Sequence, residues 1–321
     1  MIYNVLGDVK DLFNIDVDNI SFKGIDLIPE GDFSYRILDD KERDEVIVNI
    51  LKKIESDNKI VGVPERTDTW SKGWLESLEE FRKIGTPTSL IPRYMKSNQF
   101  MRLNRQFVYT NDPHFEWHAY QIFKLCLFAK YLKDFKYIYE LGCGTGHNLL
   151  TLAQLFPEKI LYGFDFVKSS SDLVNLIASK FNYNITGDLF DMLQPDMSKS
   201  LKPNSVVLTC GAIEQLASNT TPILEYLLSQ PIELCVHLEP IYELYEETNL
   251  VDYLAMKFHI KRGYTVGYLP KLQELEKQGK IDILEIKRLS FGSLYMEGYT
   301  CIIWKPLKGQ LWNIDTYSEV I

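Results

Sequence analysis

One segment of the chain combines a carboxylate with three closely spaced glycines. Glu140 stands near the end of an apolar run, and Gly142, Gly144 and Gly146 follow at alternate positions. Glycine is needed where the backbone turns sharply, takes a positive φ, or lets a ligand approach closely. Residues 148–156 have helical apolar spacing, so the turn should open a helix whose first N–H groups face a ligand. The pattern predicts a strand that ends in a nucleoside-binding turn.

The spacing G-x-G-x-G separates this turn from a dinucleotide site, whose G-x-G-x-x-G holds a pyrophosphate on the helix N-terminus. A carboxylate at position 140 would repel a pyrophosphate but suits the cationic end of S-adenosylmethionine. At these residues the chain resembles the class I S-adenosylmethionine-dependent methyltransferases, whose first motif is an acidic residue followed by such a glycine turn. The resemblance implies an enzyme that uses S-adenosylmethionine and releases S-adenosylhomocysteine, without indicating the subfamily.

Two further predicted strands end in carboxylates. Residues 160–165 end in Asp165, which lies 19 residues after Gly146 (165 − 146), the usual distance of an acid that binds ribose hydroxyls. Residues 184–188 end in Asp188, and the resemblance implies that an acidic residue at or next to this position contacts the adenine amino group. The predicted cofactor-binding residues are Glu140, Gly142, Cys143, Gly144, Thr145, Gly146, Asn148, Asp165, Asp188, Leu189 and Gly211.

Strands and helices alternate along the second part of the chain, which predicts an α/β fold. Residues 205–211 and 233–239 are near-continuous apolar runs, as expected of parallel strands covered on both faces. Residues 281–290 and 298–305 alternate between apolar and polar, and the segment between them is long enough for a hairpin. With the resemblance, this predicts a Rossmann-like seven-stranded methyltransferase sheet, mostly parallel, with one antiparallel strand.

The beginning of the chain lies outside this pattern. Helical spacing over residues 41–56 and 69–84 predicts a mainly helical N-terminal cap over residues 1–110, which would bind substrate. The methyltransferase domain would then cover residues 111–321. Residues after Pro306 look like a short tail without an assigned role.

A long helix should precede the first strand of this domain. Asn111-Asp112-Pro113 predicts its start, with a capping side chain and proline at the first helical position, and the helix should run over residues 115–132. The resemblance implies that such a helix packs beside the cofactor. Near its start, the candidate walls of the active site are Trp117, His118 and Tyr120.

Methyl transfer requires alignment of donor and acceptor and a base that takes a proton from the acceptor. His237 and Glu239 are an i, i+2 pair at the end of one predicted strand, so their side chains should share one face. We predict His237 as the general base, with Glu239 orienting it or accepting from a substrate hydroxyl. Alternatively, His237 is a hydrogen-bonded core histidine and Glu239 caps the following helix. His118 is a further catalytic candidate, with simple exposure as its alternative.

Other polar residues are candidates for substrate binding. The guanidinium of Arg262 would suit a carboxylate or phosphate, although a solvated helix face explains it equally well. Glu214 has the same two interpretations. The predicted substrate-binding residues are Trp117, Tyr120, Glu214, His259 and Arg262, and a similar aromatic and basic pattern in the cap comprises Trp70, Trp74, Arg93, Tyr94, Arg102 and Arg105. Packing of the cap onto the main domain would also explain these tryptophans.

Composition excludes several classes of partner. The formal net charge of −9 argues against a surface that tracks nucleic-acid phosphates. No apolar run reaches the roughly 18 to 20 residues of a membrane helix, and the N-terminus lacks the features of a signal peptide, so a cytoplasmic protein without membrane partners is expected. The five cysteines are far apart without a Cys-x-x-Cys pair, which predicts reduced core residues and no metal. A homodimer is compatible with the sequence.

These observations favour methylation of a hydroxyl on a small polar biosynthetic intermediate, such as a sugar or a polar, anionic compound. The Asn/Asp-Pro-Pro-aromatic signature of amino methylation on DNA bases or glutamine is missing after the strand over 205–211. Two alternatives stay open: a peptide or protein N-methyltransferase, and a non-catalytic S-adenosylmethionine-binding protein.

Overall fold

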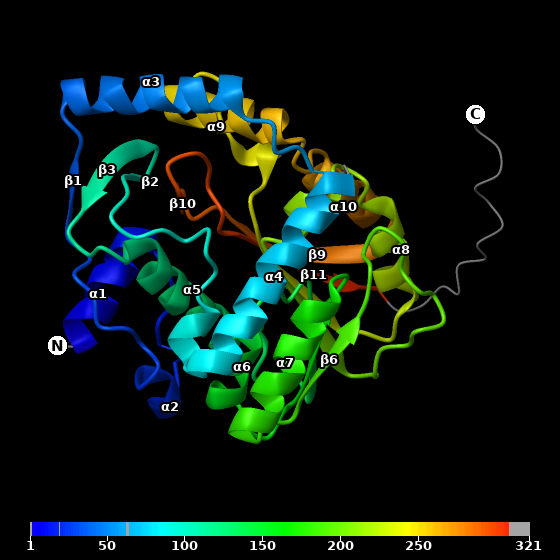
Figure 1. Cartoon of the computed structure of the whole chain (residues 1–321). Helices are drawn as coiled ribbons and strands as arrows, with labels where there is room; N and C mark the ends of the chain where they lie inside the picture. The colour runs from blue at the N-terminus through cyan, green and yellow to red at the C-terminus, as the bar shows by residue number, and fades with distance from the viewer. Residues whose placement is uncertain (1, 19, 62–63, 308–321) are drawn as a thin grey trace, which may run out of the picture.

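The computed structural model describes residues 2–18, 20–61 and 64–307, and its main feature is a seven-stranded sheet in the order β6-β5-β4-β7-β8-β11-β9 (Figure 1). The first five of these strands run parallel, and β11 runs antiparallel to both of its neighbours. The predicted mostly parallel sheet with one inserted antiparallel strand is confirmed. Its strands are β4 (Tyr137–Leu141), β5 (Ile160–Asp165), β6 (Ile185–Leu189), β7 (Ser205–Cys210), β8 (Leu234–Glu239), β9 (Ile281–Lys287) and β11 (Thr300–Pro306).

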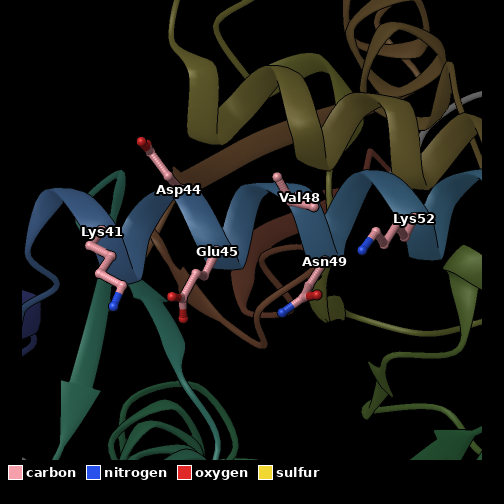
Figure 2. A pocket seen from close by; sticks show the side chains of 6 residues that line it. All are labelled: Lys41, Asp44, Glu45, Val48, Asn49 and Lys52. Carbon is pink, nitrogen blue, oxygen red and sulfur yellow. The ribbon is translucent and has the colours of Figure 1, made fainter.

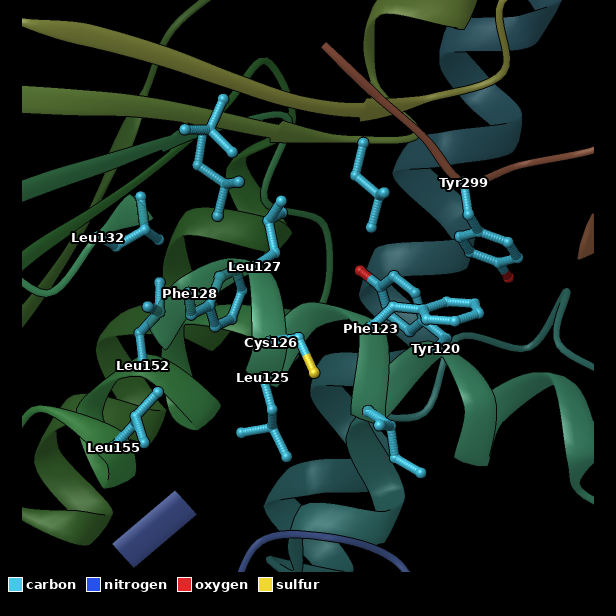
Figure 3. Packing of buried hydrophobic residues seen from close by; sticks show 14 of the residues in the cluster. Tyr120, Phe123, Leu125, Cys126, Leu127, Phe128, Leu132, Leu152, Leu155 and Tyr299 are labelled. Atoms are coloured by element: carbon cyan, nitrogen blue, oxygen red, sulfur yellow. The ribbon is translucent and has the colours of Figure 1, made fainter. Parts of the chain in front are cut away.

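Helices cover both faces of this sheet, because successive side chains of a strand point to opposite faces. In β4, Ile138 belongs to the core under α5, α6 and α7, whereas Tyr139 belongs to the core under α8 and α10. Figure 3 shows part of the first core, where Phe128 of α5 lies beside Leu152 of α6. These helices are α5 (Phe115–Tyr131), α6 (His147–Leu155), α7 (Lys168–Phe181), α8 (Thr221–Ser229) and α10 (Tyr268–Lys277).

The N-terminal part contains the two predicted helices, α3 (Asp40–Ser56) and α4 (Pro64–Ile84), together with α1 (Ile2–Phe13), α2 (Phe22–Ile25) and the 3-10 turn η1 (Pro87–Leu90). It also contains an antiparallel sheet that was not predicted, in the order β1-β3-β2-β10. Its strands are β1 (Tyr35–Ile37), β2 (Met101–Leu103), β3 (Gln106–Thr110) and β10 (Phe291–Gly292). Because β10 comes from the segment between β9 and β11, the two ends of the chain share this sheet.

The long helix α5 matches the predicted range of 115–132 to within one residue, but its start differs from the prediction. Its N-cap is His114, whose side chain makes no capping bond, and Pro113 lies outside the helix. The prediction of proline at the first helical position is therefore wrong. Asp112 accepts the N–H of His114 at 2.8 Å, which holds residues 112–114 in a turn before the helix starts.

The remaining elements follow β7 and β8. They are the 3-10 turns η2 (Ile213–Leu216) and η3 (Tyr242–Leu244) and the helix α9 (Leu250–Arg262). No helix within the described ranges is long and apolar enough to cross a membrane. Across the same ranges, no three His, Cys, Asp or Glu side chains gather closely enough to hold a metal ion.

Candidate active site

The glycine turn after β4 is held on the end of β5. Gly142, Gly144 and Gly146 all have positive φ, at +71°, +54° and +73°. The N–H of Gly142 donates to Phe164 O at 2.7 Å, and that of Gly144 donates to Asp165 Oδ2 at 2.9 Å. Because left-handed backbone disfavours side chains, glycine is required by the shape of this turn.

A chain of buried polar groups lies behind the turn. Asn148 Nδ2 donates to Glu140 Oε1 at 2.7 Å, and Asn148 Oδ1 accepts from the Tyr120 hydroxyl at 3.0 Å and from Lys124 Nζ at 3.4 Å. Burial raises the pKa of Glu140 and lowers the pKa of Lys124. Glu140 Oε2 is buried and has no hydrogen-bond partner among the described residues. A buried carboxylate oxygen without a partner is costly unless a ligand or water binds it.

The residues at this edge fit S-adenosylmethionine. The unpartnered Glu140 oxygen suits an ammonium group beside a turn that lets a ligand approach its backbone. Gly211, at the end of the neighbouring β7, has a φ of +64°, and an added Cβ would meet no atom within 4 Å. The open backbone at β7 and the acceptor at β4 therefore lie at the carboxyl edge, where open α/β sheets bind their ligands.

Three other predicted cofactor residues use their side chains to hold the glycine turn. Asp165 is buried and accepts the N–H groups of Gly144 and Val167, so it holds the turn. The side chains of Cys143 and Thr145 are likewise used within the protein, contacting Ser170 Oγ and donating to Leu90 O. Contact of Asp165 with ribose stays a prediction.

The end of β6 is exposed. Asp188 pairs with Lys199 at 2.5 Å, and Leu189 is 48% exposed. Their predicted contact with adenine is compatible with this position and stays a prediction.

His237 lies inside the protein, between side chains of β7, β11 and α10. It is fully buried, and Trp304 Nε1–H donates to its Nε2 at 2.9 Å. Because Nε2 accepts, Nδ1 carries the proton of the neutral ring and donates to Thr209 Oγ1 at 2.8 Å. Burial lowers the pKa of His237 to about 3. The geometry does not support His237 as the base and matches the alternative, a hydrogen-bonded core histidine.

Glu239 shares the strand face of His237 but contacts a different element. Its Oε1 accepts the N–H of Ala212 at 3.0 Å, immediately before η2, and burial raises its pKa to about 7. It therefore caps the turn that follows β7. Glu239 Oε2 has no partner among the described residues, so a contact with a substrate hydroxyl stays a prediction.

Three other predicted residues are used structurally. His118 Nδ1 binds Asp112 Oδ2 at 2.5 Å. His118 follows the buried Glu116 by two residues, so its side chain points roughly 200° around the helix from that of Glu116. His259 is buried at the end of α9, where Nε2 contacts Thr265 O at 2.8 Å and burial lowers its pKa to about 4. Arg262 pairs with the buried Asp57 at 2.7 Å. The geometry supports none of the three in catalysis or substrate binding.

The structure brings a carboxylate that was not predicted to the inward face of α5. Glu116 accepts from the Tyr299 hydroxyl at 3.1 Å and from Gln99 Nε2 at 2.9 Å. Burial raises its pKa to about 7. Glu116 and Tyr120 are one helical turn apart, and the rings of Tyr120 and Tyr299 lie 5.2 Å apart. This places Glu116 one turn along α5 from the Glu140–Asn148 network.

The phenol of Tyr94 responds to the charge of this carboxylate. It keeps 57% of its surface exposed, yet burial is the largest cause that raises its pKa, followed by Glu214 and Glu116 and then Cys210. The negative charges of Glu214 and Glu116 both act on Tyr94, and a role of Glu214 in substrate binding stays a prediction.

Trp117 and Tyr120 flank a histidine at the start of α6. The ring of His147 lies 5.4 Å from that of Trp117 and 5.8 Å from that of Tyr120. His147 Nδ1 contacts Thr145 Oγ1 at 3.1 Å, whereas its Nε2 is buried without a partner among the described residues. Both rings therefore lie next to the glycine turn, and their role as walls of the active site stays a prediction. His147 is a polar group that the sequence analysis did not select.

A hollow elsewhere on the surface is lined by one helix. It has a volume of about 660 Å³, and no residue of the glycine turn lines it (Figure 2). Its lining residues are Lys41, Asp44, Glu45, Val48, Asn49 and Lys52 of α3.

No protein-family model matches the chain, and no curated protein matches it. Many solved structures do. Human N-acetylserotonin methyltransferase in complex with SAM is 12% identical, with a TM-score of 0.44, over 83% of this chain and 67% of that one. The [4+2]-cyclase SpnF is 10% identical, with a TM-score of 0.49, over 74% and 94%. An rRNA methylase from Escherichia coli is 12% identical, with a TM-score of 0.41, over 95% and 100%. By its own strand order and glycine turn, the chain has the fold of the class I S-adenosylmethionine-dependent methyltransferases.

Proposed function

We propose that the protein is an S-adenosylmethionine-dependent methyltransferase that acts on a small molecule. The observation that carries the proposal is the buried, unpartnered Glu140 oxygen beside the glycine turn of a class I sheet. Glu140 and the turn would hold the amino-acid end of the cofactor, and Asp165 would stabilise the turn. Bound S-adenosylmethionine supplies a methyl group that its sulfonium makes electrophilic.

The protein's own task is to bind the acceptor, exclude water and take a proton. We propose Glu116 as the base, in place of His237. A positioned base contributes roughly 10²- to 10⁴-fold, and it works best when its pKa is near the operating pH. Burial gives Glu116 a pKa of about 7, and the Tyr299 and Gln99 bonds fix the orientation of its carboxylate.

The acceptor group in this proposal is a hydroxyl. Its proton would pass to Glu116 as its oxygen forms the bond to the methyl carbon, and the phenols of Tyr94 and Tyr299 offer hydrogen bonds to a polar molecule. An anionic acceptor has lost its support, because Arg262 is paired with Asp57. We therefore propose a polar, uncharged acceptor molecule.

An amine acceptor is the second candidate. The negative charges of Glu116 and Glu214 both raise the pKa of Tyr94, and negative charge favours an ammonium group over a hydroxyl. Glu116 would then remove the ammonium proton before the nitrogen lone pair attacks.

Calorimetry with S-adenosylmethionine tests the cofactor, and mass spectrometry of reactions with sugars, phenols and amines tests the transfer. We expect Glu116→Gln to bind the cofactor normally but lose about 10²-fold or more in kcat. Wild-type kcat/KM should rise with pH up to about 7, where the carboxylate becomes ionised, and the variant should lose this rise. Absence of cofactor uptake by folded protein would refute the proposal. Uptake without transfer to any acceptor would favour a non-catalytic binding protein.

A further inference from the structure

Helix α4 reaches the glycine turn from the N-terminal part of the chain. The ring of Trp74 lies against Gly144, so that an added Cβ on this glycine would stand 3.0 Å from Cζ2 and 3.1 Å from Cη2 of the indole. In the same region, Ser169 Oγ donates to the backbone oxygen of Ser71 at 3.4 Å. The glycine at position 144 is thus needed both for its φ and for the approach of an aromatic side chain.

Several contacts fix α4 in this place. It lies alongside α7 (Figure 1), where the rings of Phe81 and Phe181 are 6.2 Å apart. The hydroxyl of Thr145, within the glycine turn, donates to Leu90 O of η1 at 2.7 Å. Arg93 then pairs with Glu76 and Glu80, at 2.5 and 2.8 Å, and ties the segment after η1 back to α4. The position of Trp74 is therefore set by contacts on both sides of the turn.

Trp74 is not used as an ordinary core residue. It is half-buried, and its ring stacks on that of Trp70, with centroids 5.1 Å apart and planes at 24°. Packing of α4 onto α7 is accomplished by fully buried residues further along the helix, such as Leu78 and Phe81. Because Trp70 stacks on one face of this half-buried indole, the opposite face is the one that could take up a cation beside the turn.

We infer that Trp74 is a cofactor-binding residue whose indole contacts the sulfonium end of S-adenosylmethionine. This inference rests on the proposed function and adds to it a contact from outside the nucleotide-binding sheet. An indole attracts a positive sulfonium more strongly than the neutral thioether of S-adenosylhomocysteine. Trp74 therefore favours the methyl donor over the product.

Calorimetric titration of the full chain with both nucleosides tests this. From the range of cation–π energies, Trp74→Ala should weaken S-adenosylmethionine roughly 2- to 30-fold more than S-adenosylhomocysteine. Trp74→Phe keeps an aromatic ring, so its affinity for S-adenosylmethionine should fall less than that of Trp74→Ala. Leu75→Ala, a change of an exposed residue on the same helix, should leave both dissociation constants unchanged. Addition of S-adenosylmethionine should also change the tryptophan fluorescence of the wild type, and most of this change should disappear in Trp74→Phe.

Two results would overturn the inference while the proposed function stands. The first is that Trp74→Ala leaves both dissociation constants unchanged. The second is that Trp74→Ala raises the two dissociation constants equally, as expected if Trp74 only packs. If Trp74→Ala does not fold, the fluorescence of Trp74→Phe decides, and a change that persists in full would also overturn it. A folded wild type that takes up neither nucleoside would overturn the proposed function and this inference together.

Discussion

The position of His237 leads to a quantitative prediction about pH. The ring is held neutral by burial, which lowers its pKa to about 3 from an ordinary value of 6.5. In the unfolded chain the same ring takes up a proton as the pH falls below 6.5. The unfolded state then binds more protons than the folded state. The contribution of His237 to the free energy of unfolding is therefore fully present above pH 6.5 and is lost as the pH falls towards 3.

The size of the effect follows from the two pKa values. Between pH 7 and pH 5 the unfolded ring passes from mostly neutral to mostly charged, while the folded ring stays neutral. The free energy of unfolding should fall by about 2 kcal/mol over this interval from His237 alone. Other buried groups such as His259 contribute as well, so the quantity to compare is the difference between wild type and His237→Gln.

Urea unfolding followed by circular dichroism at pH 5, 6 and 7 measures this difference. His237→Gln should be less stable at pH 7, because it disrupts the hydrogen bonds to Thr209 and Trp304, but its stability should fall about 2 kcal/mol less than that of the wild type on acidification. In the wild type, the NMR signals of this ring should stay constant from pH 8 to pH 5. Parallel pH dependences, or a ring that titrates near 6.5, would refute the buried neutral state.

Two further predictions concern the glycine turn and α9. Gly142→Ala should destabilise the protein by about 2 to 4 kcal/mol, because its Cβ would stand 2.5 Å from Ala212 Cβ at a positive φ, whereas Gly211→Ala, with a similar φ and open space, should cost only about 1 to 2 kcal/mol in thermal unfolding. Equal effects would show that φ alone matters. Arg262→Met should lower stability by about 2 kcal/mol, because it leaves the buried Asp57 carboxylate without its guanidinium, and it should leave the affinity for S-adenosylmethionine unchanged; a selective loss of substrate binding would restore its predicted role.

The sequence was sufficient for the large sheet because each of its strands is a continuous or alternating apolar run. The strand over 160–165 appears with the predicted bounds. The small sheet was missed because β1, β2 and β10 are only two or three residues long, so that distant pairing, and not local preference, defines them.

The proposed base, Glu116, could not be selected from local pattern. Strand periodicity gave the shared face of His237 and Glu239, but it cannot tell that Trp304 and Tyr268 cover His237. Glu116 did carry a signal, since Glu116 and Lys124 are charged residues two turns apart on a largely apolar helix. Their inward direction depends on α5 being buried, which only the assembled fold reveals.

The small sheet has a consequence for how this protein can be divided. Its strand β10 belongs to the loop between β9 and β11, and Phe291 of that strand meets Phe13 of α1 at 5.2 Å between rings. A fragment that starts at residue 111 would lose the partner strand of β10 and lay bare the aromatic side of α5. A chimera that takes its N-terminal region from a related protein would therefore need the loop between β9 and β11 from that same protein.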